Sequence, residues 1–575
     1  MGSTGNNQMR NWWFVFLVLV LCSQSGTQGI ARFTPPVRGK IELTGTFGEL
    51  RSNHFHGGLD IRGEIGRPVY AIADGYVSRI QITVSGYGQA LFLEHPSGHT
   101  SVYGHLDRFR DDISAYARNR QYAQENFVLE EEPTPDRFPV KQGDLIGFIG
   151  ARGFVSGPHL HFEIRDTYSG RMLNPLNFGV SVSDHRRPFI SGLRLYELDE
   201  RGRVLAGTDV GVRSLGNGQY RTTPDTLYVS GPSFGLAVKA YDQQDGRPNF
   251  NGIYGLELWQ NDTARFAYHL DDFAGEDTRY LNAHLDYAEQ RRHSSWLQRA
   301  FRMPGNPLDI YRTGAQEGRL HLQPGEVAQL RIHITDHPQN AADLNILVSR
   351  RQVTAPLQNP VYTCRLPYDE ENLIDDRSVR AHFPPGALYE DLLLDYDFLP
   401  EQSQGLYSPV HRLHRSSTPL HRHFDLHIRP NAIREDLKTK AIITHCDDGK
   451  DPTSYGGEWT PDGRLRAPVR TFGNFAIMVD TTPPKIVAER FGADMRGWDR
   501  FSFRVTDNFP TAGKARDLRF RAEVDGHWIL LEYDARKNRL YHDFDGRIPP
   551  GEHLLVLRVQ DDRNNETVVE LGFKR

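Results

Sequence analysis

The sequence has few cysteines and little net charge. Its 575 residues include 3 cysteines and no Cys-x-x-Cys spacing, which argues against a cysteine zinc site or a cysteine nucleophile. Lys and Arg number 68 against 73 Asp and Glu, and the net charge of -5 argues against nucleic acid or an anionic membrane as the main partner. The charged and apolar fractions are ordinary for a globular protein, and the length predicts several domains.

The N-terminal sequence indicates an export signal. Arg10 precedes the apolar run "WWFVFLVLVLC" (12–22) and the small polar stretch "SQSGTQG". This order is typical of a secretory signal peptide, expected at residues 1–29, and the run is too short to span a bilayer comfortably. An alternative is lipidation of Cys22, because "LVLC" resembles a bacterial lipobox, although Leu21 departs from the small residue expected there. We therefore expect an exported protein of the periplasm, cell envelope or exterior.

Export also decides how the remaining cysteines are interpreted. Cys364 and Cys446 are the two that the mature chain would keep, and both lie in the same later segment. In an oxidising compartment they form either one disulfide or two buried thiols, and the sequence leaves both interpretations open.

The first domain, expected at residues 33–183, is predicted to be all-β. From 41 to about 178, short alternating strands are separated by glycines, as in "PVYAIADGYVSRIQIT" and "HLHFEIR". The exception is an insert at 107–138, with the helical stretch "DISAYARNRQYAQENF" and the acidic tract "LEEEPTPDRF". Such an insert is either a surface lid or wall, or a decorative loop.

The rest of the chain contains an internal repeat. "DHRRPFI" (184–190) matches "DTTPPKI" (480–486), and "PGEVAQLRIHITDHPQN" (324–340) matches "PGEHLLVLRVQDDRNN" (550–565). Further strands, "GLAVKAYD" and "RFSFRVTD", lie between these markers. The pattern predicts immunoglobulin-like β-sandwiches at 184–351, with a helical insert at 277–301, and at 480–575, separated by a β-rich domain at 352–479. Such repeats favour spacers or binding modules, including modules that bind a protein partner.

Two further motifs have competing interpretations. "HRHFDLHI" (421–428) offers alternate histidines for a second metal, but its apolar opposite face is explained by ordinary strand alternation. "DDRNNET" (561–567) suggests calcium, but Asx-rich turns between strands explain it as well.

Five residues of the first domain carry the chemistry. His56 and Asp60 lie in "HFHGGLDI", His105 ends the strand "SVYGHL", and His159 and His161 alternate in "VSGPHLHFEI". Residues i and i+2 of a strand share a face, so the last two imidazoles emerge side by side. A catalytic zinc takes three protein ligands of the His or Asp type and leaves a position for water, whose pKa it lowers. Five such residues suffice for three ligands and two groups that handle protons or an oxyanion.

From about 45 to 178 the sequence resembles the LytM-like, lysostaphin-type zinc metallopeptidases that cut peptide bonds of bacterial cell walls. The resemblance is carried by "TFGELR", "HGGLDI", "GRPVYAIADGYV", "GYGQALFLEHPSGHTSVYGHL", "VKQGDLIGFIG" and "SGPHLHFEIRD". It implies a small antiparallel β fold with one zinc ion. By this resemblance, His56, Asp60 and His161 are the zinc ligands, while His105 and His159 handle protons and steady the tetrahedral intermediate.

Two positions need comment within this resemblance. His54 competes with His56 for the first ligand position, but the H-x-G-x-D spacing selects His56. Arg152, in "GARG", stands where the family commonly has a small hydroxyl residue. Neither feature removes a ligand, so we expect an active enzyme.

The resemblance implies an exported zinc endopeptidase that hydrolyses the peptide cross-links of peptidoglycan. Two alternatives stay open at this point. One is a catalytically silent protein that binds the wall or regulates other enzymes. The other is an adhesin or scaffold that acts through its β-sandwiches.

Overall fold

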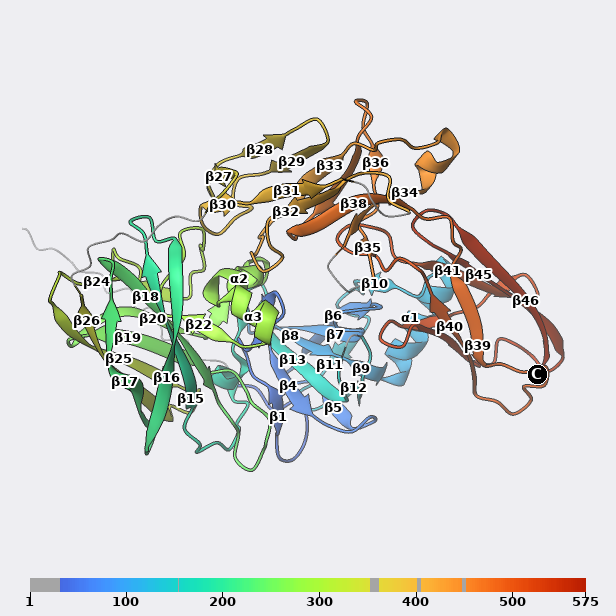
Figure 1. Ribbon diagram of the computed structural model, residues 1–575. Coiled ribbons are helices and arrows are strands. Elements are labelled where there is room, and N and C mark those ends of the chain that lie inside the picture. Colours follow the sequence, from blue (N-terminus) through green and yellow to red (C-terminus); the bar gives the residue numbers. More distant parts are fainter. Residues whose placement is uncertain (1–31, 154, 352–360, 401–404, 447–450) are drawn as a thin grey trace, which may run out of the picture.

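The computed structural model describes residues 32–153, 155–351, 361–400, 405–446 and 451–575, and Figure 1 shows that β-strands dominate it. The predicted all-β class is confirmed. The expected signal peptide at 1–29, with Cys22, lies outside the described residues. In the described part of the chain, no helix combines the length and apolarity needed to cross a membrane.

The N-terminal region is built on an antiparallel sheet whose central strands carry the site. The strand order is β1-β4-β13-β8-β7-β6-β10. The bounds are β1 (Leu43–Gly45), β4 (Leu59–Arg62), β6 (Gly75–Ile82), β7 (Gln89–His95), β8 (His99–Gly104), β10 (Leu129–Glu131) and β13 (His159–Asp166). A smaller sheet, β5-β12-β9, packs beside it, from β5 (Pro68–Tyr70), β9 (Leu106–Phe109) and β12 (Leu145–Ile149). Short strands β2 (Leu50–Arg51) and β3 (His54–Phe55) form a hairpin ahead of β4.

The insert at 107–138 is integrated into the fold. Its helical stretch forms α1 (Asp111–Gln124), as expected, and β10 extends the main sheet by pairing with β6. On its outer side α1 contacts the C-terminal part of the chain: the Tyr122 hydroxyl donates to Asp545 at 2.8 Å, and Arg521 pairs with Glu125 at 2.7 Å. The insert therefore serves as a docking surface for a distant segment.

In the first β unit (residues 189–350), eleven strands are connected by pairing into one sheet. The long strand β16 pairs with β15 along its first half and with β17 along its second half, and so carries the chain between the two parts. The main strands are β15 (Phe189–Leu198), β16 (Val204–Gly216), β17 (Gln219–Val229), β18 (Ser233–Tyr241), β19 (Gly255–Gln260), β20 (Thr263–His269), β22 (Leu297–Arg299), β23 (Tyr311–Thr313), β25 (Val327–Thr335) and β26 (Ala341–Arg350).

The helical stretch expected at 277–301 is shorter than predicted. It forms η2 (Gly275–Tyr280), α2 (Leu281–His284) and α3 (Tyr287–His293), and its end forms strand β22. Just ahead of it, β21 (Asp272–Phe273) pairs with β14 (Met172–Leu173) of the N-terminal region. One hydrophobic core runs through both parts, from Phe33 to Val348. The first β unit is therefore joined to the N-terminal region by shared core and backbone pairing.

The middle β unit (residues 364–479) has two five-stranded sheets around its own core. One contains β28 (Asn372–Asp375), β29 (Val379–Phe383), β33 (Phe424–Ile428), β37 (Leu465–Val469) and β36 (Glu458–Trp459), and the other β31 (Tyr396–Leu399), β32 (Val410–Leu413), β38 (Gly473–Val479), β34 (Ala441–His445) and β35 (Thr453–Ser454). Cys364 and Cys446 are half-buried and not disulfide-bonded, so the structure favours the thiol interpretation. The "HRHFDLHI" strand buries Phe424, Leu426 and Ile428, in keeping with ordinary alternation.

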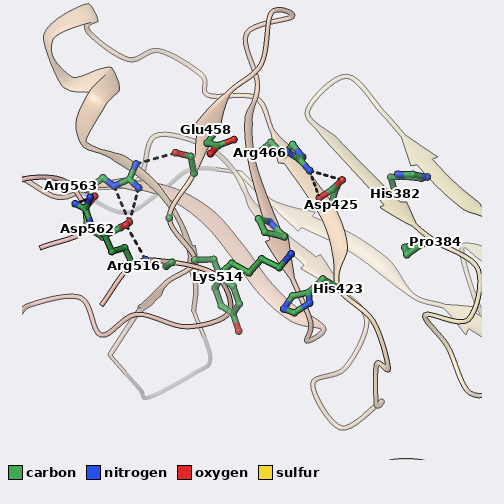
Figure 2. Close-up of a pocket in the computed structure, with 15 residues that line it drawn as sticks. His382, Pro384, His423, Asp425, Glu458, Arg466, Lys514, Arg516, Asp562 and Arg563 are labelled. Carbon is green, nitrogen blue, oxygen red and sulfur yellow. Dashed lines mark hydrogen bonds and ion pairs between the residues drawn. The ribbon is translucent and has the colours of Figure 1, made fainter. Parts of the chain in front are cut away.

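The last β unit (residues 485–574) is a sandwich of two four-stranded sheets around a separate core. The sheets contain β39 (Lys485–Arg490), β40 (Arg500–Thr506), β44 (Arg539–Asp543) and β43 (Glu532–Asp534), and β42 (His527–Trp528), β41 (Arg519–Val524), β45 (Glu552–Gln560) and β46 (Glu566–Lys574). A cavity of about 600 Å³ lies between this unit and the middle β unit (Figure 2). There Arg563 donates to the carbonyl oxygens of Ala441 and Gly457, at 3.2 and 3.1 Å. Side-chain contacts to backbone thus join the two units.

Candidate metal centre

Strand register brings His161 and Asp60 together. In the antiparallel pair β4–β13, His161 lies directly opposite Asp60, and His159 points to the same face two residues earlier. The two strands approach closely beside the motif, because a Cβ on Gly58 would lie 2.2 Å from the Phe162 carbonyl oxygen. The second glycine of "HGGLD" is therefore required by packing.

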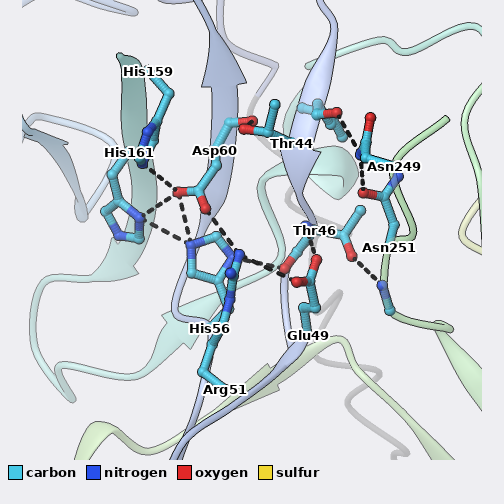
Figure 3. A network of polar contacts seen from close by, with 12 residues as sticks. Thr44, Thr46, Glu49, Arg51, His56, Asp60, His159, His161, Asn249 and Asn251 are labelled. Atoms are coloured by element: carbon cyan, nitrogen blue, oxygen red, sulfur yellow. Dashed lines mark hydrogen bonds and ion pairs between the residues drawn. The ribbon is translucent and has the colours of Figure 1, made fainter. Parts of the chain in front are cut away.

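Three side chains converge at the centre of the site (Figure 3). His56 Nε2 and His161 Nδ1 each lie 3.0 Å from Asp60 Oδ1, and they are 3.0 Å from each other. All three residues are buried. Burial opposes ionisation of Asp60, but the charge of His56 and the hydrogen bonds with both His159 and His161 lower its pKa well below its usual range.

This donor set fits a zinc ion. The three ligand atoms form a group that could hold a metal, all within 4.8 Å of one another. Ligand atoms around a tetrahedral zinc are about 3.4 Å apart, so a small outward shift of these side chains accommodates the ion. Burial opposes protonation of His161, yet hydrogen bonds with Asp60 and Glu163 raise its pKa to about 9. The surroundings of this imidazole therefore favour positive charge at the centre.

Three groups outside the donor set fix its orientation. The Thr46 carbonyl oxygen accepts from His56 Nδ1 at 2.8 Å, which leaves Nε2 facing the centre. Glu163 Oε1 accepts from His161 Nε2 at 2.8 Å, which leaves Nδ1 facing the centre. Arg51 donates to the outer oxygen of Asp60 at 3.0 Å. Partners of this kind select the tautomer and ring orientation of metal-binding histidines.

Glu163 is the most constrained of these groups. Its residue is 1% exposed, and its carboxylate also accepts from the Tyr87 hydroxyl at 2.5 Å and from Arg165 Nε at 2.7 Å. Burial opposes its ionisation, but the hydrogen bond with His161 and the charge of Arg165 outweigh burial and lower its pKa to about 2. Glu163 was not predicted from the sequence, although it stands two positions after His161 and so shares its strand face.

His105 and His159 lie beside the three converging residues. Their ring centroids are 4.8 Å apart, and His159 Nε2 lies 3.4 Å from Asp60 Oδ1. His159 Nδ1 donates to the Gly157 carbonyl oxygen at 2.9 Å, and His105 Nδ1 to that of Arg152 at 3.0 Å. Each Nε2 is therefore left free of these backbone contacts, and that of His159 faces Asp60. Burial, with the charges of His161 and His159, lowers the pKa of His105 to about 3.

Arg152 connects the site to the last β unit. Its carbonyl oxygen holds His105, while its guanidinium donates to Glu532 and to the Tyr541 hydroxyl. The departure noted in the sequence thus coincides with a contact between distant parts of the chain. Of the predicted residues, all five gather here, whereas His54 is exposed and donates to the Ser52 carbonyl oxygen.

Two segments of the chain match known protein families. Residues 54–121 match Peptidase family M23, and residues 363–480 match the Zu5-like domain. The chain is 32% identical over 135 residues to the DD-carboxypeptidase/endopeptidase Mpg of Neisseria meningitidis, covering 24% of this chain and 25% of that protein. It is 31% identical over 143 residues to the murein hydrolase activator NlpD of Escherichia coli, covering 25% of this chain and 30% of that protein. The chain thus spans about a quarter to a third of these relatives.

Solved structures also match about a quarter of this chain. The catalytic domain of the prophage-encoded M23 protein EnpA from Enterococcus faecalis is 23% identical, with a TM-score of 0.19, covering 25% of this chain and 95% of that one. The catalytic domain of lysostaphin from Staphylococcus simulans is 24% identical, with a TM-score of 0.18, covering 23% of this chain and 87% of that one.

Proposed function

Because the N-terminal region carries a peptidase family M23 domain of the LytM type, we propose that the protein is a zinc-dependent endopeptidase that hydrolyses peptide cross-links of peptidoglycan. The observation that carries this proposal is the convergence of His56, Asp60 and His161 beside two further imidazoles. We further propose export to the periplasm or cell envelope, by a cleaved signal peptide or through lipidation of Cys22.

The side chains divide the work in the proposed reaction. When bound by His56, Asp60 and His161, zinc would polarise the scissile carbonyl and lower the pKa of a water molecule. One of His105 and His159 would accept the proton that the attacking water loses, and the other would donate a hydrogen bond to the developing oxyanion. The imidazole that has accepted the proton then passes it to the leaving amine.

An activator without hydrolytic turnover is the second candidate, because relatives named murein hydrolase activator match about a quarter of this chain. The five side chains proposed for catalysis are all present and close together, which favours the enzyme. In a scaffold or adhesin, by contrast, the β units would act and His161→Ala would leave cellular function unchanged.

The test is hydrolysis of purified sacculi by the zinc-loaded full chain, with the released muropeptides identified by mass spectrometry. We expect cleavage by the wild type, loss of zinc and activity in His56→Ala, and retention of both in His54→Ala, the matched exposed control. Full zinc content without cleavage in any condition would exclude the enzyme and leave the activator. The masses of the products also identify the bond that is cut.

A further inference from the structure

The repeated sequence segments each bring three aspartates together. Asp184 precedes β15, Asp242 follows β18 and Asp336 follows β25 in the first β unit. Their ligand oxygens lie within 4.8 Å of one another. Asp480, Asp507 and Asp561 occupy the corresponding places around β39, β40 and β45 of the last β unit, with the same spacing. We name these groups the first and second aspartate triads.

An asparagine frames each triad in the same way. Asn340 donates from its backbone and side-chain nitrogens to the two carboxylate oxygens of Asp336, both at 2.7 Å. It also donates to the Asp184 carbonyl oxygen at 3.3 Å. Asn565 repeats all three contacts with Asp561 and Asp480, at 2.8, 2.7 and 3.0 Å. The Asp-x-x-x-Asn turn of the sequence therefore positions one carboxylate toward two others.

Within the described ranges, the first triad contains a buried carboxylate oxygen that receives no hydrogen bond. Asp242 is 5% exposed, and its Oδ1 has no hydrogen-bond partner. Burial, together with the charges of Asp184 and Asp336, raises the pKa of Asp242 above its ordinary value. Among the described residues, no ion pair reaches any of these three aspartates. An unpaired buried carboxylate is costly, so this place requires either a cation or a proton.

The second triad differs in its surroundings. Lys440 Nζ donates to Asn565 Oδ1 at 2.6 Å, and its charge acts to lower the pKa of Asp480. Among the described residues, Asp507 Oδ1 is also buried without a hydrogen-bond partner, but the Asp507 residue as a whole is half-buried whereas Asp242 is buried. Positive charge acts on one aspartate of each triad, Lys440 on Asp480 and Arg186 on Asp184. The first triad is distinguished by the deeper burial of its unsatisfied member, Asp242.

We propose that Asp184, Asp242 and Asp336 bind a calcium ion. Three carboxylates without nitrogen or sulfur donors suit a hard cation, and calcium accepts flexible oxygen coordination completed by water. The adjoining cavity of about 400 Å³, lined by Asp184, Asp242, Thr46 and Tyr254 among others, gives room for those waters. Zinc prefers the His-containing centre described above.

The proposed ion lies close to a loop that supports the metal centre. Asp242 and Asn251 exchange two backbone hydrogen bonds, at 3.0 and 2.8 Å, and the next residue, Gly252, donates to Thr46 Oγ1 at 3.2 Å. The Thr46 carbonyl oxygen in turn holds His56 (Figure 3). Calcium would therefore brace the contact between the first β unit and the N-terminal region. Its binding does not depend on the proposed peptidase activity.

The experiment is calorimetric titration of the zinc-loaded, calcium-free full chain with CaCl2, together with thermal unfolding with and without calcium. We expect calcium binding and a higher melting temperature in the wild type. Both effects should be absent in Asp242→Asn and Asp184→Asn. They should persist in Asp507→Asn of the second triad and in Asp262→Asn, an exposed turn residue of the same β unit that serves as the charge-matched control.

Several outcomes would overturn the proposal. One outcome is that the wild type binds no calcium, and that the calcium-free Asp242→Asn variant is more stable than the calcium-free wild type at pH 8. Together these two results would show that the triad shares a proton instead. Calcium binding that survives in Asp242→Asn and Asp184→Asn but is lost in Asp507→Asn would assign the ion to the second triad. Folding of each variant is checked by its zinc content and circular dichroism.

Discussion

Replacing Glu163 by glutamine removes one negative charge next to the candidate metal centre and preserves the size of the side chain. The side chain keeps its shape, but His161 Nε2, at 2.8 Å, no longer faces a carboxylate. Partners of metal-binding histidines contribute about 10- to 100-fold to metal affinity or activity. We therefore expect zinc affinity to fall by about 10- to 100-fold, which corresponds to about 1.4–2.7 kcal/mol.

The assay is competition for zinc between the protein and a chelator of known affinity, followed by sacculus hydrolysis at saturating zinc. Glu94→Gln is the matched control, because Glu94 accepts from the Tyr76 hydroxyl at 2.5 Å on β7, in the same sheet but outside the centre. Thermal unfolding separates a local effect from a folding defect, since Arg165 also loses a charged partner in Glu163→Gln. Zinc affinity equal to that of the control would refute the positioning role of Glu163.

Three further predictions test other parts of the site and fold. His105→Ala and His159→Ala should each keep zinc, measured by mass spectrometry, while muropeptide release falls about 10²- to 10⁴-fold; loss of zinc instead would make them ligands. In calcium-free protein, the raised pKa of Asp242 means that the folded state binds more protons than the unfolded state, so the free energy of unfolding should fall as pH rises through the neutral range. Asp242→Asn should flatten that slope in denaturant titrations, and an unchanged slope would contradict the assignment. Glu532→Gln should lower hydrolysis at full zinc occupancy, because it weakens the contact that holds Arg152; unchanged kcat would show that the contact is structural only.

The convergence of the candidate metal ligands could be anticipated from the sequence because these residues lie in short motifs with informative spacing. Alternation in β13 placed His159 and His161 on one face, and the structure has them there. The pairing of His161 with Asp60 across two strands depends on long-range register, which local sequence does not encode. Strand alternation also places Glu163 on the face of His161. The sequence "HFEI" does not show whether this glutamate is buried or exposed, because its partners Tyr87 and Arg165 are known only from the structure.

For the repeated segments, less of the structure could be predicted from the sequence. The sequence repeat between 184–340 and 480–565 indicated related strands and turns. It could not show that their aspartates converge. That convergence requires Asp242, at the end of β18, to meet Asp336, at the end of β25, and these strands are far apart in the sequence. The connection of these strands into one sheet could not be predicted from the sequence either. Strand β16 changes partners along its length without any break in its sequence pattern.

The docking of the last β unit gives the insert and Arg152 a common physical explanation. Tyr122 of α1 packs edge-on against Trp528 at 5.2 Å and donates to Asp545, while Arg152 reaches Glu532 of the same unit. The two partners of Arg152 lie 380 and 389 residues later in the chain, so only the folded chain reveals why an arginine stands there. A small hydroxyl residue at this position could not extend to the last β unit. Since the Arg152 carbonyl oxygen also holds His105, displacement of the last β unit changes the support of a proposed proton-handling group while leaving the three proposed zinc ligands in place.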